Sequence, residues 1–231
     1  MSKQTNVDAW LKRETPHKRK AFENASTYFY KKDEFTVNTL EAIYAQESSF
    51  GTQLGERGSK DAVGEFQIKR ATAKRYGLIV TKKNDQRFDI DYASITAARY
   101  LKDLDVEFSK NTDLGDKNTF PVEDLLERKK FVLAAYNGGE GTIAKAQALA
   151  QKAGKNPANW NDVQEFLEKA KAADPDQIRK YIKGISKNEI EFAKKSSANK
   201  KSKDKKDFKP RPFCKKGHWI TKDDHHIFIC D

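Results

Sequence analysis

Apolar residues recur at helical spacing through most of this chain of 231 residues. The clearest stretch runs from Tyr92 to Phe108, where one face carries Ile95, Ala98, Leu101, Leu104 and Phe108. Similar spacing predicts helices over residues 36–47, 69–77, 122–136, 142–153, 160–173 and 176–192. Patterns typical of strands are weak before residue 212, so we expect an all-α body.

The two ends of the chain differ from this helical body. Residues 1–35 read as an N-terminal helical arm, in which Pro16 should break or restart the helix. Residues 194–211 are rich in Lys, Ser and Asp without apolar periodicity, which is typical of a linker. Residues 212–231 then predict a small β-hairpin with its turn near residues 222–224. The helical domain between arm and linker would span residues 36–193.

The charge of the protein is concentrated in one segment. The formal net charge is +11, but residues 194–216 hold ten Lys and one Arg against two Asp and so carry +9 of it. The rest of the chain is nearly neutral and has no basic helix interleaved with aromatic residues, so no specific nucleic-acid partner is expected. The Lys-rich segment is either a solvated linker or a site of attraction for an anionic polymer.

Membrane and export signals are weak. No run approaches the roughly 18 apolar residues that a membrane span needs. The first residues contain no apolar segment of the kind found in signal peptides, so we expect either a protein not exported by that route or a mature form. Two cysteines exclude a disulfide-dense scaffold.

One acidic residue interrupts an apolar helix face. One face of this helix carries Leu40, Ile43, Tyr44 and Glu47 at i, i+3, i+4 and i+7. This face is apolar except for its last member, Glu47. Burial there would raise the pKa of the carboxyl, as a general acid near neutral pH requires. If Glu47 instead lies at a frayed helix end, its carboxyl is an ordinary exposed one. The pattern alone leaves both interpretations open.

Three short motifs add to this observation: Glu47-Ser48-Ser49-Phe50, residues 62–68 (AVGEFQI) and residues 134–141 (AAYNGGEG). Their order and intervals resemble those of the soluble lytic transglycosylase and goose-type lysozyme superfamily, which cleaves peptidoglycan and has the pattern E-S-x-F, A-x-G-L-M-Q-I and A-Y-N-x-G-x-G. Residues 97–101 and 177–182 resemble two further segments of that family. The resemblance covers residues 36–190 and implies an all-α lysozyme-like catalytic domain with a small C-terminal β-hairpin appendage.

The resemblance also implies roles for matched residues. Glu47 would be the single catalytic acid and base, with no cofactor. Tyr136 and Tyr181 would line the site, or each could instead pack in the core with its hydroxyl hydrogen-bonded. Glycine at positions 64, 138 and 141 would allow the backbone a positive φ or a close approach to the sugar. The expected substrate-binding residues are Ser48, Gln67, Tyr136, Asn137 and Tyr181.

The chain departs from the family pattern beside the predicted site. Glu65-Phe66 replaces the usual Leu-Met before Gln67, and Lys69 replaces an Asp of the goose-type lysozymes. Residues 55–58 (GERG) resemble the G-D-R-G of those lysozymes. Glu65 is therefore counted among the residues expected at the substrate.

These departures leave the type of reaction open. With no second carboxylate, the muramic 6-hydroxyl attacks and a 1,6-anhydro product forms, which is lytic transglycosylation. If Glu56 or Asp61 holds a water, the enzyme is a hydrolytic muramidase. Inverting hydrolysis requires the two catalytic carboxyl groups to lie about 6.5–9.5 Å apart, so that the water fits between them and the sugar. Glu56 could equally be a loop charge paired with Arg57 or a nearby lysine.

Two less conventional functions follow from the same acids. With Glu65, Glu56 and Asp61 near the cleft, deacetylated peptidoglycan with its cationic amines would be favoured. The changed Glu65-Phe66 also motivates the alternative of an inactive glycan-binding module.

The C-terminal hairpin holds both cysteines. Cys214 and Cys230 are disulfide candidates, because a peptidoglycan enzyme works in an oxidising compartment. Zinc bound by Cys214, His218, His226 and Cys230, or two free thiols, are the alternatives. The partner implied by the resemblance is the glycan strand of peptidoglycan, and the protein is expected to be a periplasmic or secreted monomer.

Overall fold

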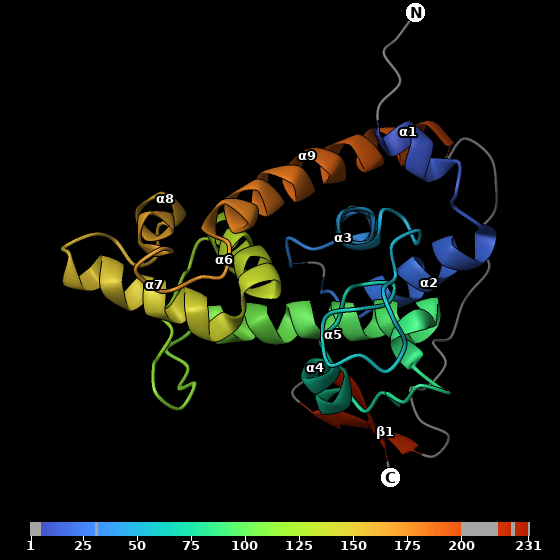
Figure 1. Ribbon diagram of the computed structural model, residues 1–231, viewed down its shortest axis with the longest axis horizontal. Coiled ribbons are helices and arrows are strands. Elements are labelled where there is room, and N and C mark those ends of the chain that lie inside the picture. The colour runs from blue at the N-terminus through green and yellow to red at the C-terminus, as the bar shows by residue number, and fades with distance from the viewer. Residues whose placement is uncertain (1–5, 31, 200–216, 223–224, 231) are drawn as a thin grey trace, which may run out of the picture. The chain divides into compact units, whose positions relative to one another are not determined.

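The computed structural model describes residues 6–30, 32–199, 217–222 and 225–230, and the side chains of the described residues up to 195 (Figure 1). The chain divides into two compact units, with the boundary after Ala198. The first unit contains the helices, and the second contains the paired strands near the C-terminus.

The described part of the first unit is helical, which confirms the all-α expectation. The helices are α1 (Asn6–Leu11), α2 (Pro16–Ser26), α3 (Val37–Ser48), α4 (Arg70–Arg75), α5 (Ile90–Phe108), α6 (Leu125–Gly138), α7 (Glu140–Lys152), α8 (Trp160–Val163) and α9 (Pro175–Asn199), with 3₁₀ turns η1 (Gln86–Phe88) and η2 (Gln164–Phe166).

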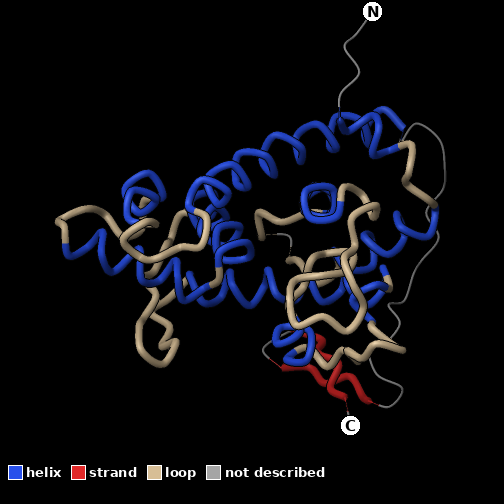
Figure 2. The backbone as a smooth tube through the Cα atoms, in the orientation of Figure 1, coloured by secondary structure: helices blue, strands red, loops and turns tan. Residues whose placement is uncertain are grey.

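Helix α5 is the central element of this unit. It packs against α2, α3 and α6. Four members of its predicted stripe, Ala98, Leu101, Leu104 and Phe108, are fully buried, and the fifth, Ile95, is half-buried. Figure 2 shows the loop segments between α3 and α4, and between α4 and α5, gathered on one side of it.

Helix starts follow capping residues. Pro16 restarts the chain as predicted, with Thr15 as N-cap accepting from the Lys18 N–H. Thr36 caps α3 through a capping box with Thr39. The predicted start of α6 at residue 122 is three residues early, because the Asp124 side chain accepts from the Glu127 N–H and caps the helix there.

Two predicted helix lengths are wrong. The helix expected over residues 160–173 stops as α8 and continues as the 3₁₀ turn η2, and Lys171 takes a positive φ of 63°. Helix α9 is longer than expected and ends at Asn199, inside the predicted linker. The extension follows from packing, since Phe192 stacks on Trp10 and Lys195 forms an ion pair with Asp8 of α1.

The N-terminal arm contributes to the core of the first unit. Phe22 of α2 is fully buried, and its ring lies 5.2 Å from that of Tyr44 and 6.1 Å from that of Phe66. Burying large rings stabilises the contact between α2 and α3. The arm therefore supports the helix that carries Glu47.

The described part of the second unit contains strands β1 (Gly217–Lys222) and β2 (His225–Cys230), which pair antiparallel with Gly217 opposite Cys230. The turn was predicted near residues 222–224, of which residues 223–224 lie outside the described residues, as does Cys214. The disulfide and zinc predictions also depend on side chains outside the described part, so both stay predictions.

Two searches of the described residues give no positive result. None of the described helices is long and apolar enough to cross a membrane. Among side chains in the described part, no three His, Cys, Asp or Glu residues cluster as metal ligands would.

Candidate active site

Tertiary contacts hold the C-terminal end of α3 in place, so this helix end is not frayed. Ser49, Phe50 and Gly51 have φ of 48°, 61° and 84°, so three successive left-handed residues turn the chain sharply away from the helix. The buried Phe50 ring lies 4.8 Å from the Tyr44 ring, and the Arg13 guanidinium donates to the Ser49 carbonyl at 2.8 Å. The last turn of α3 therefore holds Glu47 in a defined position.

The Glu47 carboxyl has the raised pKa that its apolar helix face predicts. Burial raises its pKa to about 7, and the Tyr181 hydroxyl opposes that rise by favouring the charged form. Tyr181 is itself buried, and its hydroxyl completes no hydrogen bond of ordinary geometry in the described part of the chain. Burial, with the charge of Glu47 adding to it, raises the pKa of Tyr136 and of Tyr181.

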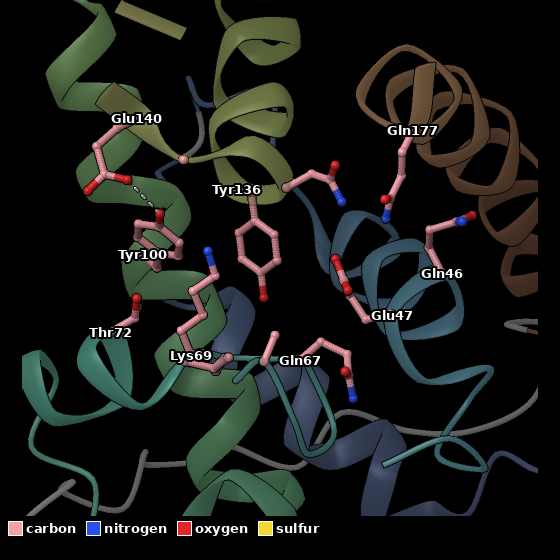
Figure 3. Close-up of a pocket in the computed structure, with 13 residues that line it drawn as sticks. Gln46, Glu47, Gln67, Lys69, Thr72, Tyr100, Tyr136, Glu140 and Gln177 are labelled. Atoms are coloured by element: carbon pink, nitrogen blue, oxygen red, sulfur yellow. Dashed lines mark hydrogen bonds between the residues drawn. The ribbon is translucent and has the colours of Figure 1, made fainter. Parts of the chain in front are cut away.

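Two pockets meet at Glu47. The first, drawn in Figure 3, has a volume of about 390 Å³ and the second about 340 Å³, and both are lined by Gln46, Glu47, Asn137 and Gln177. The first extends toward Gln67, Tyr136 and Lys69, and the second toward Tyr181 and Lys180. An elongated ligand could therefore occupy space on both sides of the Glu47 carboxyl.

A buried ion pair shapes the loop that forms one wall. Arg87 and Asp85 are buried and joined at 2.7 Å. The Arg87 guanidinium also donates to the backbone carbonyls of Ser59, Asp61 and Ile68. Burial acts to raise the pKa of Asp85, but hydrogen bonds from Arg87 and the Gly58 N–H hold it below its usual range.

Gln67 lies at the tip of a tight turn closed by the bridge between Val63 and Ile68. Its φ of 46° is unusual for a residue with a side chain. The side-chain amide donates to the carbonyls of Gly64 and Gln53 at 2.9 and 3.2 Å. Gly64 has a φ of 83° and a Cβ there would lie 2.1 Å from the Arg87 carbonyl oxygen, which explains the glycine.

The end of α6 supplies the facing wall. The Tyr136 hydroxyl donates to the Phe66 carbonyl at 3.0 Å, and Asn137 lines both pockets. Gly138 allows α9 to approach, since a Cβ there would lie 2.6 Å from Cδ1 of Ile178. The third predicted backbone glycine is different: Gly141 lies inside α7 with ordinary space around it.

The far end of the first pocket was not predicted. Figure 3 shows Lys69, Thr72, Tyr100 and Glu140 at this end. The Tyr100 hydroxyl donates to Glu140 at 2.9 Å, and Arg75 lies 3.6 Å from the same carboxylate. Both Tyr100 and Glu140 fall inside segments that resemble family motifs, and this was the signal that could have found them.

Two predicted site residues lie behind the wall rather than in the pocket. Ser48 is fully buried, donates to the Tyr44 carbonyl and accepts from the Gly51 N–H, so it shapes the turn after α3. Glu65 is 9% exposed and accepts a hydrogen bond of 2.7 Å from the Tyr44 hydroxyl. Glu65 therefore does not line the pocket, because its side chain turns into the core.

The acids proposed for hydrolysis also lie elsewhere. Glu56 and Asp61 are exposed, and neither lines either pocket. The Asp61 carboxylate accepts from the Ser59 hydroxyl at 3.4 Å. The structure therefore does not gather Glu65, Glu56 and Asp61 around the two pockets. The preference for deacetylated glycan stays a prediction.

Comparison with known proteins places this site in a family. The family model described as transglycosylase SLT domain matches residues 25–159. Three similar curated proteins are each named membrane-bound lytic murein transglycosylase F. That of Cronobacter sakazakii is 34% identical over 128 residues, which cover 55% of this chain and 21% of the relative.

The other two relatives are more similar over their aligned parts. The Marinobacter nauticus protein is 51% identical over 104 residues (45% of this chain, 17% of the relative). The Alcanivorax borkumensis protein is 47% identical over 147 residues (63% and 27%). The chain thus spans between 17% and 27% of the length of these relatives. Because the family model matches more than half of the chain, and its span holds Glu47, Gln67 and Tyr136, this protein belongs to the transglycosylase SLT domain family.

Proposed function

We propose that this protein cleaves the β-1,4 bond between N-acetylmuramic acid and N-acetylglucosamine in peptidoglycan, with Glu47 as the catalytic acid and base. The observation that carries the proposal is the carboxyl of Glu47, with a pKa of about 7, at the junction of two pockets. A general acid of that pKa is protonated in a large fraction of molecules at neutral pH. Membership of the family supports the choice of substrate.

In the proposed reaction, Glu47 donates its proton to the oxygen that links the two sugars. The bond to the muramic carbon breaks, and an oxocarbenium-like state develops there. The resulting Glu47 carboxylate then accepts the proton of the muramic 6-hydroxyl as that oxygen attacks the same carbon. The products are a shortened glycan and a 1,6-anhydro end, and Glu47 returns to its protonated form.

The placement of the acids favours this lytic transglycosylation over hydrolysis. Among the described residues that line the two pockets, the other carboxylates are Glu140 and Asp174. Glu140 is engaged by Tyr100 and Arg75, and Asp174 accepts from the Gln177 N–H at 2.8 Å. Each already accepts a hydrogen bond from a neighbouring residue, which competes with a water, and Glu56 and Asp61 do not line the pockets.

The remaining site residues take supporting roles in the proposal. Gln67 offers its side-chain carbonyl to a sugar, because its amide nitrogen is tied to the loop. Asn137 contacts sugar beside Glu47, and Tyr136 forms the wall. Tyr181 is a positioning residue that acts through the Glu47 carboxyl.

The test is mass spectrometry of the soluble products after digestion of purified peptidoglycan. Wild type is expected to release products lighter by one water than reducing-end muropeptides. Glu47→Gln should lower the rate by about 10²- to 10⁴-fold, the usual contribution of a general acid. Glu56→Gln and Asp61→Asn are matched controls that remove an acid outside the pockets and should retain the activity.

Other outcomes would redirect the assignment. Reducing ends together with a loss of rate in Glu56→Gln or Asp61→Asn would establish a hydrolytic muramidase. Glycan binding without cleavage by wild type would establish an inactive binding module. Because the proposed substrate surrounds the cell, we also propose that the protein acts in the periplasm or outside the cell, as a monomer. Its Lys-rich segment would attract anionic wall polymers.

A further inference from the structure

A lysine side chain reaches into the first pocket. Lys69 is the N-cap residue of α4, directly after the bridge between Val63 and Ile68 that holds Gln67 in its turn. Its backbone carbonyl accepts from the Ala73 N–H, so both sides of the residue are fixed. Figure 3 shows its side chain rising toward Tyr100 and Tyr136, on the other side of the pocket from Glu47.

The charges around Lys69 leave its ammonium uncompensated. It is the only Lys or Arg among the described residues lining this pocket, and it forms no ion pair with any described side chain. Glu140, which lines the same pocket, is already engaged by Tyr100 at 2.9 Å and by Arg75 at 3.6 Å. Glu47 has a raised pKa whose causes do not include Lys69. The pocket therefore offers one positive charge to a ligand.

We propose that Lys69, with Thr72 one turn further along α4, forms an anion subsite that binds a carboxylate carried by the muramic acid residue of the glycan. Both side chains line the pocket from the same wall. A lysine donates up to three charge-assisted hydrogen bonds, and a threonine hydroxyl adds a neutral donor. The inference rests on the proposed function and names the part of the substrate that this end of the pocket recognises.

The chemistry of the substrate supplies two sources of that carboxylate. Muramic acid differs from glucosamine by a lactyl ether that ends in a carboxyl group. In peptide-free glycan this group is a free carboxylate, and in stem-bearing glycan it is an amide to a peptide that carries carboxylates of its own. A chito-oligosaccharide has neither, so it is the neutral probe for the same pocket.

The test is calorimetric binding in a Glu47→Gln background, where no turnover disturbs the titration. The three ligands are peptide-free glycan strands, stem-bearing glycan strands and a chito-oligosaccharide of matched length. Lys69→Met should weaken binding of one or both muramic glycans by about three- to ten-fold, the range expected for a partly exposed charge pair. Binding of the chito-oligosaccharide should not change, and added salt should reduce the difference.

Two further variants make the result specific. Lys69→Arg keeps the charge and should retain most of the affinity. Lys74→Met removes a charge from the same helix but from a residue that lines neither pocket, and should change nothing. A response only with peptide-free strands assigns the subsite to the lactyl carboxylate, and a response only with stem-bearing strands assigns it to the peptide.

The inference and the proposed function can fail separately. Equal affinities of Lys69→Met and its parent for all three ligands would overturn the anion subsite while wild-type cleavage stands. An equal loss for the chito-oligosaccharide would also overturn it, because Lys69 would then bind sugar hydroxyls. Charge-dependent binding by a wild type that cleaves no glycan would retain the subsite and overturn the cleavage proposal. Failure of every glycan to bind would overturn both.

Discussion

At the scale of single residues, burial gives the Glu47 carboxyl a protonation equilibrium near pH 7. The proposed reaction begins with the protonated form, so activity should fall as the pH rises through this value. The Tyr181 hydroxyl sets where that fall occurs, because it favours the charged form of Glu47 and holds the pKa lower than burial alone would.

Tyr181→Phe should therefore raise the pKa of Glu47 further and move the alkaline limb of the activity profile to higher pH. The fold should tolerate the change, since the hydroxyl completes no hydrogen bond of ordinary geometry in the described structure. The measurement is the pH dependence of kcat for glycan cleavage. Tyr136→Phe is the matched control, because that hydroxyl donates to the Phe66 carbonyl and should leave the limb in place. An unmoved limb in Tyr181→Phe would remove the positioning role.

At the scale of elements, the loop between α3 and α4 depends on a contact from outside itself. Arg87, the middle residue of the 3₁₀ turn η1, donates to three carbonyls of that loop, while Asp85 accepts from the Gly58 N–H. The loop has little regular structure to hold its shape. One buried guanidinium therefore donates to three of its carbonyls. Because one of these belongs to Ile68, the residue after Gln67, the same guanidinium also helps to position Gln67.

Arg87→Met should lower the free energy of unfolding by about 3–5 kcal/mol, because it leaves Asp85 buried without its partner. Urea unfolding measures this loss. Arg57→Met is the matched control, since Arg57 is exposed and touches the same region through the Asp85 carbonyl at 3.3 Å and the Phe88 ring at 4.5 Å. It should cost under about 1 kcal/mol. Similar losses in both variants would mean that Arg87 is not the centre of the loop.

At the scale of the whole molecule, several acids share the same direction of pKa shift. Burial raises the pKa of Glu47 and of Glu107 to about 7, and raises that of Glu41. A carboxyl whose pKa is raised by folding binds more protons in the folded state, so its contribution is present below about pH 4.5 and is lost as the pH rises through 7. The protein should therefore become less stable between pH 5 and pH 8.

Glu47→Gln should remove part of this loss. At pH 8 the variant should be more stable than wild type by up to about 3 kcal/mol, from a pKa that moves from 4.5 to about 7 on folding. At pH 4.5 most of this difference should vanish. Thermal unfolding at the two pH values measures it, and the same difference at both would show that the gain does not come from the ionised carboxylate.

Local patterns in the sequence determined the helices and the catalytic candidate. The stripe ending at Glu47 predicted both a helix and a raised pKa, because periodicity and desolvation act within two turns of one helix. The three motifs indicated the family because each is a short, contiguous segment that can be read from the sequence without knowledge of the fold.

Tertiary structure decided which residues share the pocket. From its charge and its position beside Gln67, the sequence predicted that Glu65 contacts the substrate. In the structure its side chain faces the core, where it accepts a hydrogen bond from the Tyr44 hydroxyl. Lys69 and Tyr100 line the same pocket because Tyr76, the residue after α4, packs against Tyr100 of α5, a contact between segments far apart in the sequence. Helix periodicity fixes which face a side chain takes, but long-range packing and the pairing of buried charges fix which faces meet.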